Sequence, residues 1–286
     1  MKIAILGKGG SGKSTVSWLL AKHLSKKNKV LVIDADHNMD LMANLGITVD
    51  SSTPAFYKAN DEIRKLANMP ALGRWAGYMK LQPLLLNYNQ NSINSELLNQ
   101  YIISVSSNLD LITMGLGEDD IMYGDKCAHG LSAHLKYILP TIQVNTSDTL
   151  LIDSVAGADM LNYGLYYGCD FVCVVVEGHK NSIKVATQLL EIAKKQSINL
   201  KFILNKYNLD NQIIVDFEKE FEAYIIGKLP NDPKVLDLDF DKISPDLVQA
   251  LDNLTSNMRA IKLILDLEKH AKLSTFENQK AKMNSL

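Results

Sequence analysis

The sequence predicts a doubly wound α/β protein, in which a mostly parallel sheet of about seven strands carries helices on both faces. Two observations lead to this prediction. Short runs of Val, Ile and Leu recur along the chain, and their continuous apolarity is typical of strands buried on both faces. Helical patterns separate most of these runs, and such alternation favours parallel strands joined by right-handed crossovers.

The predicted elements follow one another in chain order. The apolar runs cover residues 3–6, 30–33, 109–114, 149–153, 171–176, 200–204 and 223–226. Helical patterns cover residues 13–27, 180–196 and 246–270. Seven strands with helices between them fit an open, doubly wound sheet.

We expect a single domain over residues 1–273. Residues 50–108 interrupt the alternation, because they are rich in Asn, Leu and Tyr and contain no clear strand, so we interpret them as a helical insertion. The last residues, 274–286, are polar and rich in lysine. Such an end of a chain is typically a frayed tail.

Composition limits the class of protein. The chain has 286 residues, of which 47% are hydrophobic, enough for one large core. Its net charge of −2 gives no overall attraction to nucleic acid or anionic lipid. Three cysteines suggest no disulfide framework, and the first apolar run is too short for a signal peptide. No apolar run reaches the roughly 18 residues of a membrane helix, so we expect a cytoplasmic protein.

A glycine-rich loop directly follows the first predicted strand. Residues 7–15 read G-K-G-G-S-G-K-S-T and satisfy the phosphate-loop pattern G-x-x-x-x-G-K-[ST] between a strand and a helix. The backbone N–H groups that would surround the phosphates belong to Gly9, Gly10, Ser11 and Gly12. Lys13 would reach the β- and γ-phosphates, Ser14 would bind Mg²⁺, and Thr15 would donate to the α-phosphate. A glycine-rich turn that binds nothing is the disfavoured alternative.

A second lysine, Lys8, makes the loop more specific. The pattern K-G-G-x-G-K-[ST] resembles the deviant Walker A motif of the MinD/ParA/nitrogenase-iron-protein superfamily. The resemblance implies a protein that binds Mg-ATP, hydrolyses it to ADP and phosphate, and forms a homodimer on ATP. It also implies that Lys8 crosses the dimer interface and contacts the partner's nucleotide. A solvated lysine in a loop is the alternative.

Acidic residues follow two of the predicted strands. Carboxylates at the carboxyl ends of parallel strands lie in the crevice where doubly wound sheets bind ligands. The resemblance implies that Asp36 orients the attacking water, and that Asp40 contributes near Mg²⁺. Asp40 could equally cap a helix that begins at Leu41. Asp153 ends a strand in the manner of a Walker B motif and is expected to hold Mg²⁺.

Three further residues are candidates for the nucleobase pocket. Asn205 follows the sixth predicted strand, where its amide could pair with the adenine edge. Pro230 and Asp232 resemble the superfamily's P-x-D segment beside the base. The segment 154–157 resembles the switch II loop, whose glycine N–H contacts the γ-phosphate only while ATP is bound.

Cys127 and His129 distinguish between branches of the superfamily. The segment around them resembles the CooC-type nickel-inserting ATPases of carbon monoxide dehydrogenase maturation, which have Cys-x-Cys at this place. His129 stands where that family has its second cysteine. Two Cys–His pairs from two subunits could bind Ni²⁺ or Zn²⁺. An unpaired thiol and a surface histidine are the alternative.

The sequence is compatible with three functions to different degrees. The favoured one is a metallocentre-maturation ATPase that couples its nucleotide state to binding of a client metalloenzyme. The alternative is a ParA- or MinD-like partitioning or positioning ATPase on DNA or membrane, which the polar tail and the balanced charge disfavour. An iron–sulfur electron donor is nearly excluded, because residues 154–162 contain no cysteine.

Overall fold

A computed structural model describes most of the chain. The described residues are 1–36, 38–48, 50, 52–59, 62, 86–87, 95–115, 135, 139–140, 142–157, 161 and 165–283. Side chains are described for these residues except 86–87, 95–96, 165 and 271–283.

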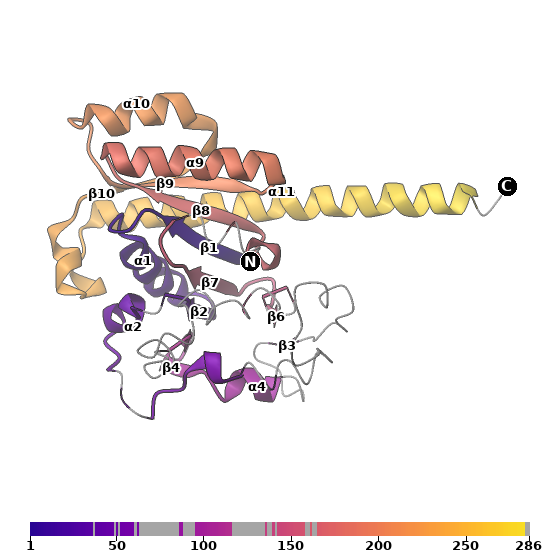
Figure 1. Cartoon of the computed structure of the whole chain (residues 1–286), viewed down its shortest axis with the longest axis horizontal. Coiled ribbons are helices and arrows are strands. Elements are labelled where there is room, and N and C mark those ends of the chain that lie inside the picture. The colour runs from indigo at the N-terminus through magenta and orange to yellow at the C-terminus, as the bar shows by residue number, and fades with distance from the viewer. Residues whose placement is uncertain are drawn as a thin grey trace, which may run out of the picture.

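The described chain forms an eight-stranded sheet of order β10-β9-β8-β1-β7-β2-β5-β4 (Figure 1). Its strands are β1 (Lys2–Gly7), β2 (Val30–Asp34), β4 (Ile103–Ser106), β5 (Leu109–Thr113), β7 (Thr149–Asp153), β8 (Phe171–Val176), β9 (Leu200–Tyr207) and β10 (Ile225–Pro230). All neighbours pair in parallel except β4, which is antiparallel to β5. A separate two-residue parallel pair joins β3 (Leu86–Asn87) to β6 (Ile142–Gln143). The predicted fold class, a mostly parallel doubly wound sheet, is confirmed.

Two details of the predicted sheet are wrong. The eighth strand, β4, lies inside residues 50–108, where no strand was expected. Its half-buried Ile103 and Val105 alternate with the exposed Ser104 and Ser106, so this edge strand has no continuous apolar run. The last strand begins at Ile225 and ends at Pro230, whereas residues 223–226 were predicted, because a short 3₁₀ helix occupies Glu222–Tyr224.

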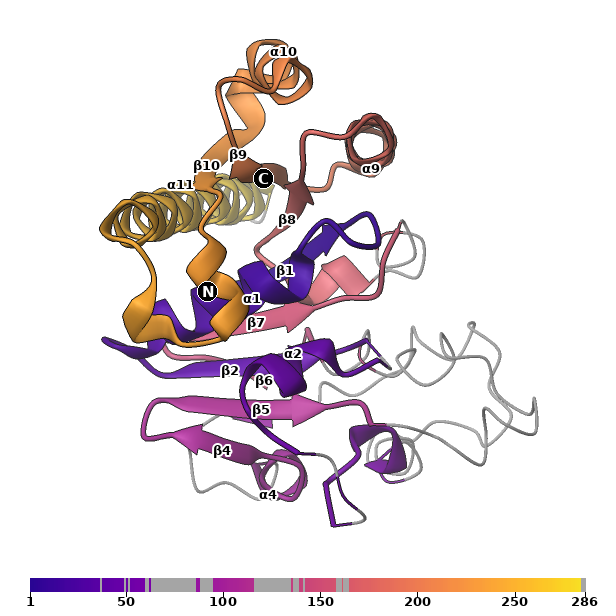
Figure 2. The ribbon, with the colours of Figure 1, turned by 90° about the vertical axis from the view of Figure 1, so that its left-hand side faces the viewer.

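Helices cover both faces of the sheet, as Figure 2 shows. They are α1 (Lys13–Ser25), α2 (Asp40–Asn44), α4 (Ser95–Asn99), α9 (Lys180–Gln196), α10 (Gln212–Phe221) and α11 (Pro245–Met283). Alternate residues of β1 serve the two faces: Ile3 and Ile5 join the core under α1 and α11, while Ala4 and Leu6 join the core under α9. This two-sided burial explains why the strands read as continuous apolar runs.

Short 3₁₀ helices complete the described elements. They are η1 (Phe56–Ala59), η3 (Leu165–Gly168), η4 (Glu222–Tyr224), η5 (Pro233–Asp237) and η6 (Phe240–Lys242). Of these, η5 and η6 lie between β10 and α11, beside the site described below.

The final helix, α11, is longer than predicted. The prediction ended it at His270 and gave residues 274–286 as a frayed tail, whereas α11 continues to Met283. Neither Gly nor Pro occurs after Pro245, so the sequence contains no helix breaker there. Figure 1 shows α11 continuing well beyond the sheet. In the described part of the chain, no helix is both long and apolar enough to cross a membrane.

Candidate nucleotide site

The phosphate loop lies between β1 and α1, at the carboxyl edge of the sheet. Gly12 is the residue before α1 and has a left-handed backbone, with φ +81°. A Cβ there would lie 2.4 Å from Nδ2 of Asn205, so the position requires glycine for two reasons. That same Nδ2 donates a hydrogen bond to the Ser11 carbonyl oxygen (3.0 Å). The loop is therefore tied directly to the end of β9.

Lys13 and Asp153 bring opposite charges together under the loop. Lys13 is buried at the start of α1, and Asp153 is fully buried at the end of β7. Burial raises the pKa of Asp153 to about 6, although hydrogen bonds from Ser14 and Ser17 and the charge of Lys13 lower it. The Ser17 hydroxyl donates to Asp153 Oδ1 at 2.9 Å.

The residues at the end of β7 fit a magnesium ion. Among the described residues, no hydrogen-bond donor reaches Asp153 Oδ2, although this oxygen is buried. The hydroxyl of Ser14 lies within hydrogen-bonding reach of the same carboxyl group. An unpartnered carboxylate oxygen beside a hydroxyl is a donor set that Mg²⁺ accepts. The structure thus brings Ser14 and Asp153 together, and their binding of Mg²⁺ stays a prediction.

Asp34 is a site residue to which the sequence assigned no role. It pairs in register with Asp153 on the adjacent strand, and both carboxyl groups are buried. Its two oxygens accept from the backbone N–H groups of Asp36 (3.3 Å) and Met42 (3.1 Å). Burial raises the pKa of Asp34 well above its usual range, and the neighbouring Asp153 raises it further. Asp34 therefore shapes the segment that carries Asp36.

Asp36 and Asp40 differ in their surroundings. Asp36 is buried, and its Oδ1 accepts from the Asn38 N–H (3.1 Å). Asp40 is exposed and is the first residue of α2, with Met39 in the N-cap position. The alternative in which Asp40 caps a helix beginning at Leu41 is therefore wrong. The helix begins one residue earlier, because Met39 adopts a left-handed backbone there.

The segment after Asp153 runs back to the phosphate loop. The Ser154 hydroxyl donates to the Ile5 carbonyl oxygen (2.7 Å), and the Gly157 N–H donates to the Gly7 carbonyl oxygen (3.0 Å). Lys8 is half-buried beside them, and its Nζ donates to the Gly9 carbonyl oxygen at 2.7 Å. Within one chain, Lys8 thus turns back onto its own loop.

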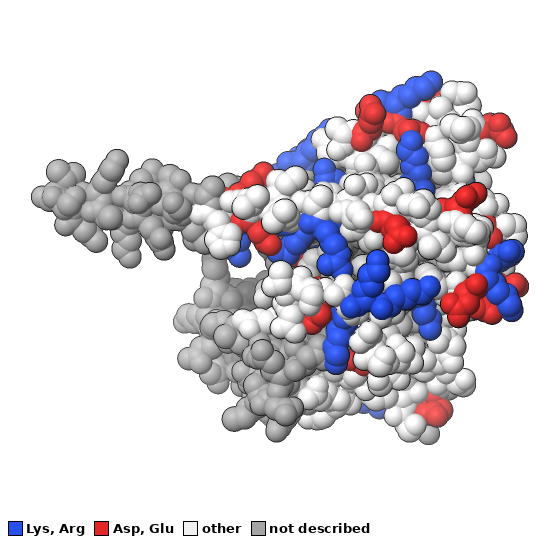
Figure 3. Space-filling model, turned by 180° about the vertical axis from the view of Figure 1, so that it is seen from behind, with Lys and Arg blue, Asp and Glu red and all other residues white. Residues whose placement is uncertain are grey.

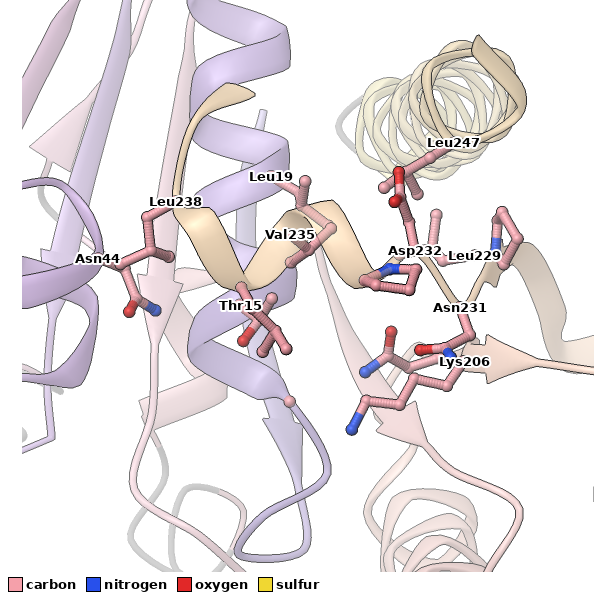
Figure 4. Close-up of a pocket in the computed structure, with 15 residues that line it drawn as sticks. Thr15, Leu19, Asn44, Lys206, Leu229, Asn231, Asp232, Val235, Leu238 and Leu247 are labelled. Atoms are coloured by element: carbon pink, nitrogen blue, oxygen red, sulfur yellow. The ribbon is translucent and has the colours of Figure 1, made fainter. Parts of the chain in front are cut away.

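A pocket of about 660 Å³ extends from the phosphate loop toward α11 (Figure 4). Gly12 and Thr15 line one side, and the predicted base residues Asn205, Pro230 and Asp232 line the pocket with them. The remaining lining includes apolar side chains from η5 and the residues around it, such as Val235, Leu236 and Leu238. The structure therefore places two of the predicted phosphate residues, Gly12 and Thr15, in the same cavity as the three predicted base residues.

Asp232 has a local task that the sequence did not reveal. Its carboxylate accepts from the backbone N–H groups of Ser244 (2.6 Å) and Lys234 (3.0 Å). These hydrogen bonds, led by the one from Ser244, hold the pKa of Asp232 below its usual range. Asp232 therefore fixes the loop over the pocket to the start of α11, and the spacing P-x-D alone gave no sign of this.

Cys127 and His129 lie outside the described residues, so their geometry stays a prediction. Among the described residues, no group of three or more Asp, Glu, His or Cys side chains could hold a metal ion.

The fold and this site define a P-loop nucleotide-binding protein. The chain belongs to the CobQ/CobB/MinD/ParA nucleotide-binding domain family, whose model matches residues 2–245. An uncharacterised ATP-binding protein of Methanocaldococcus jannaschii is 28% identical over 238 residues, covering 82% of this chain and 90% of its own. The carbon monoxide dehydrogenase accessory protein CooC of Rhodospirillum rubrum is 26% identical over 239 residues, covering 82% and 85%.

Solved structures share the fold. A plasmid partition protein of Borrelia burgdorferi bound to AMPPNP has a TM-score of 0.57 at 22% identity, covering 90% of this chain and 97% of its own. The septum site-determining protein MinD of Pyrococcus horikoshii with Mg-ADP has a TM-score of 0.59 at 19% identity, covering 88% and 93%. These structures support the fold, and the family match confirms the predicted superfamily.

Proposed function

We propose that this protein is a Mg-ATP-dependent switch ATPase that works as a homodimer. The observation that carries the proposal is the phosphate loop: its buried Lys13 lies near Asp153, whose buried Oδ2 has no hydrogen-bond partner among the described residues, and the loop's Gly12 also lines the adjoining pocket. In a family of nucleotide-binding domains, this arrangement suits a nucleoside triphosphate and its metal ion.

Each end of the site has a distinct task in this proposal. Lys13 and the loop N–H groups bind the phosphates, while Ser14 and Asp153 hold Mg²⁺, which neutralises phosphate charge. The Asn205 amide, which already donates to the loop, can accept from the exocyclic amino group of adenine through Oδ1. Asp36 orients the water that attacks the γ-phosphate.

Gly157 provides a means of switching. Its N–H donates to the Gly7 carbonyl oxygen in the structure. A γ-phosphate would compete for this N–H, so the segment after β7 would move when ATP binds and return after hydrolysis. Lys8, half-buried on the phosphate loop, would then exchange its bond to the Gly9 carbonyl oxygen for the partner's nucleotide.

Phosphate release with and without Mg²⁺ tests this proposal. Wild-type protein should hydrolyse ATP only with Mg²⁺, and Asp36→Ala should still bind ATP while its turnover falls at least about tenfold. Asp50→Ala, an exposed acid in the same part of the chain, is the control and should behave like wild type. Wild-type turnover in Asp36→Ala would remove Asp36 from the mechanism.

We further propose that the switch serves metallocentre maturation, with a client metalloenzyme as its partner. The support is the similarity to CooC together with the Cys127–His129 pair in the sequence. Two such pairs in a dimer would bind Ni²⁺ or Zn²⁺. Metal analysis of reduced protein should find about one ion per dimer, lost in Cys127→Ala but kept in Cys169→Ala. Metal-free wild-type protein that dimerises equally with and without Ni²⁺ would contradict this role.

One observation favours the second candidate, a ParA-like ATPase on DNA. Figure 3 shows lysine and arginine side chains gathered in a band on the face that α11 covers. Arg259 of α11 donates to Asn28 (2.8 Å), which follows Lys26 and Lys27 at the end of α1. A salt-sensitive gel shift with ATP and double-stranded DNA, weakened in Lys26→Glu/Lys27→Glu, would support this candidate. No shift at low salt would remove it.

A further inference from the structure

Lys206 occupies an unusual place in the nucleotide pocket. It directly follows Asn205 at the end of β9 and lines the cavity together with Thr15 and Pro230. Its backbone is left-handed, with φ +50°, a conformation that is strained for a residue with a Cβ. Figure 4 shows its side chain across the pocket from Thr15. A contact with a neighbouring residue is therefore needed to keep Lys206 in this conformation.

Glu177 holds the end of the Lys206 side chain. Lys206 Nζ lies 2.8 Å from Glu177 Oε1, and the Glu177 side chain is only 8% exposed. A carboxylate so deeply buried is rarely found unpaired, and removing the lysine would leave an uncompensated buried charge. Glu177 follows β8, the strand next to β9, so the two residues end adjacent parallel strands.

The segment that carries Glu177 is itself fixed. The Glu177 N–H donates to the Ser182 hydroxyl oxygen (3.0 Å), which ties the end of β8 to the first turn of α9. The Asn211 amide donates to the Gly178 carbonyl oxygen (3.0 Å) and ties the same segment to the start of α10. With its backbone restrained from both helices, Glu177 presents its carboxylate at a defined position. It therefore serves as an anchor for the longer and more exposed lysine.

We propose that Glu177 is a positioning residue for the nucleobase: by binding the ammonium group, it holds the Lys206 methylenes as one wall of the base pocket. This proposal rests on the proposed function, since it requires that a nucleotide occupies the pocket. A lysine held by its end exposes an apolar stem, and such stems cover flat apolar surface well. Holding the stem before binding removes the entropy cost of ordering it when the base arrives.

The proposal separates binding of the base from binding of the phosphates. The phosphates meet the loop and Lys13, whereas Lys206 lines the base pocket beside Asn205, and Glu177 contacts Lys206 only through its ammonium group. A change at Glu177 should therefore weaken a ligand with a base and leave a ligand made only of phosphates unaffected.

Calorimetric titration of Mg-ATP and of magnesium tripolyphosphate tests this separation. Glu177→Gln should bind ATP about tenfold more weakly while its tripolyphosphate affinity changes less than about twofold. Glu191→Gln, an exposed acid on α9 that pairs with Lys194, is the matched control and should leave both affinities unchanged. Unchanged tripolyphosphate binding also shows that the Glu177→Gln site is folded.

A double-mutant cycle shows whether Glu177 acts through Lys206. Lys206→Ala removes the stem and should lower ATP affinity at least as much as Glu177→Gln does. Adding Glu177→Gln to Lys206→Ala should then have no further effect. Additive losses, or an unchanged ratio of ATP to tripolyphosphate affinity in Glu177→Gln, would overturn the proposal. If wild-type protein binds tripolyphosphate but gains nothing from the adenosine, the proposed function fails instead.

Discussion

At the scale of single residues, the site depends on charges buried at the ends of strands. Asp34 and Asp153 are paired in register and both buried, and burial raises the pKa of each; the charge of Asp153 raises that of Asp34 further. Two backbone N–H groups offset this for Asp34, and Lys13 with two serine hydroxyls offsets it for Asp153. A cation at the unpartnered Asp153 oxygen would complete this balance.

Lys13→Ala tests the phosphate end of the site. Because Lys13 is the buried cation of the loop, its loss should weaken ATP binding at least about 100-fold. Lys22→Ala, on the same helix and half-buried, is the control. Titration of the two variants with a fluorescent ATP analogue compares them, and equal affinities would contradict the role of Lys13. Circular dichroism checks that Lys13→Ala folds.

The functional residues of the site could be predicted only where they belong to a recognisable sequence motif. Lys13, Ser14 and Asp153 follow from strand–loop–helix and strand–carboxylate patterns, and the structure brings them together. Asp34 and Glu177 could not be assigned, because their roles depend on partners on adjacent strands that are distant in sequence. For Asp232, the motif named the residue but not its hydrogen bonds to the α11 start.

At the scale of elements, the loop, β9 and α1 are coupled through Gly12. Gly12→Ala would place a methyl group 2.4 Å from the Asn205 amide, in addition to the strain of φ +81°. We expect ATP affinity to fall at least about tenfold, because Asn205 must leave the loop. Gly46→Ala has a similar φ of +77° with no atom within 4 Å, so it carries the strain alone. Equal ATP affinity in the two variants would contradict the coupling.

The contact between α1 and α11 should depend on pH through His23. His23 Nε2 lies 3.2 Å from Asp252, and burial lowers the His23 pKa while Asp252 partly raises it. Since the folded pKa is below the unfolded value of 6.5, the unfolded chain binds more protons near that pH. The contribution of His23 to the free energy of unfolding is therefore fully present at higher pH, and it is lost as the pH falls below about 6.5.

Urea unfolding of wild type and His23→Gln measures this effect. Wild type should lose more stability than His23→Gln between about pH 7.5 and pH 5.5. The comparison with His23→Gln is needed because two other groups also titrate. The pKa values of Asp34 and Asp153 are raised in the folded protein, so their contribution to the free energy of unfolding increases as the pH falls. Parallel stability curves for the two proteins would contradict the assignment to His23.

Buried elements could be predicted from the sequence, and elements at the margins could not. The inner strands and α9 follow from apolar runs and helical periodicity, because both faces of the sheet are covered. Strand β4 is half-solvated at the edge, so its alternating pattern is weak. The sequence after His270 is polar and rich in lysine, and only the absence of Gly and Pro there indicates how long α11 is.

At the scale of the whole molecule, the nucleotide pocket lies between the phosphate loop and the start of α11. Asp232 joins the loop over the pocket to Ser244, which directly precedes α11. The half-buried Lys8 lies on the phosphate loop at the other end of the site. In the proposed dimer, the second subunit would meet this end.

The central claim is that Lys8 of one subunit completes the ATP site of the other, and mixing two inactive variants tests it most directly. Lys8→Ala keeps an intact site but has no lysine for its partner, whereas Asp36→Ala has a disabled site and an intact Lys8. In an equal mixture, half of the dimers are mixed, and each contains one complete site.

ATP hydrolysis in the mixture should recover to about a quarter of the wild-type rate, while each variant alone stays inactive. A mixture as inactive as its components, or an active Lys8→Ala homodimer, would contradict the central claim.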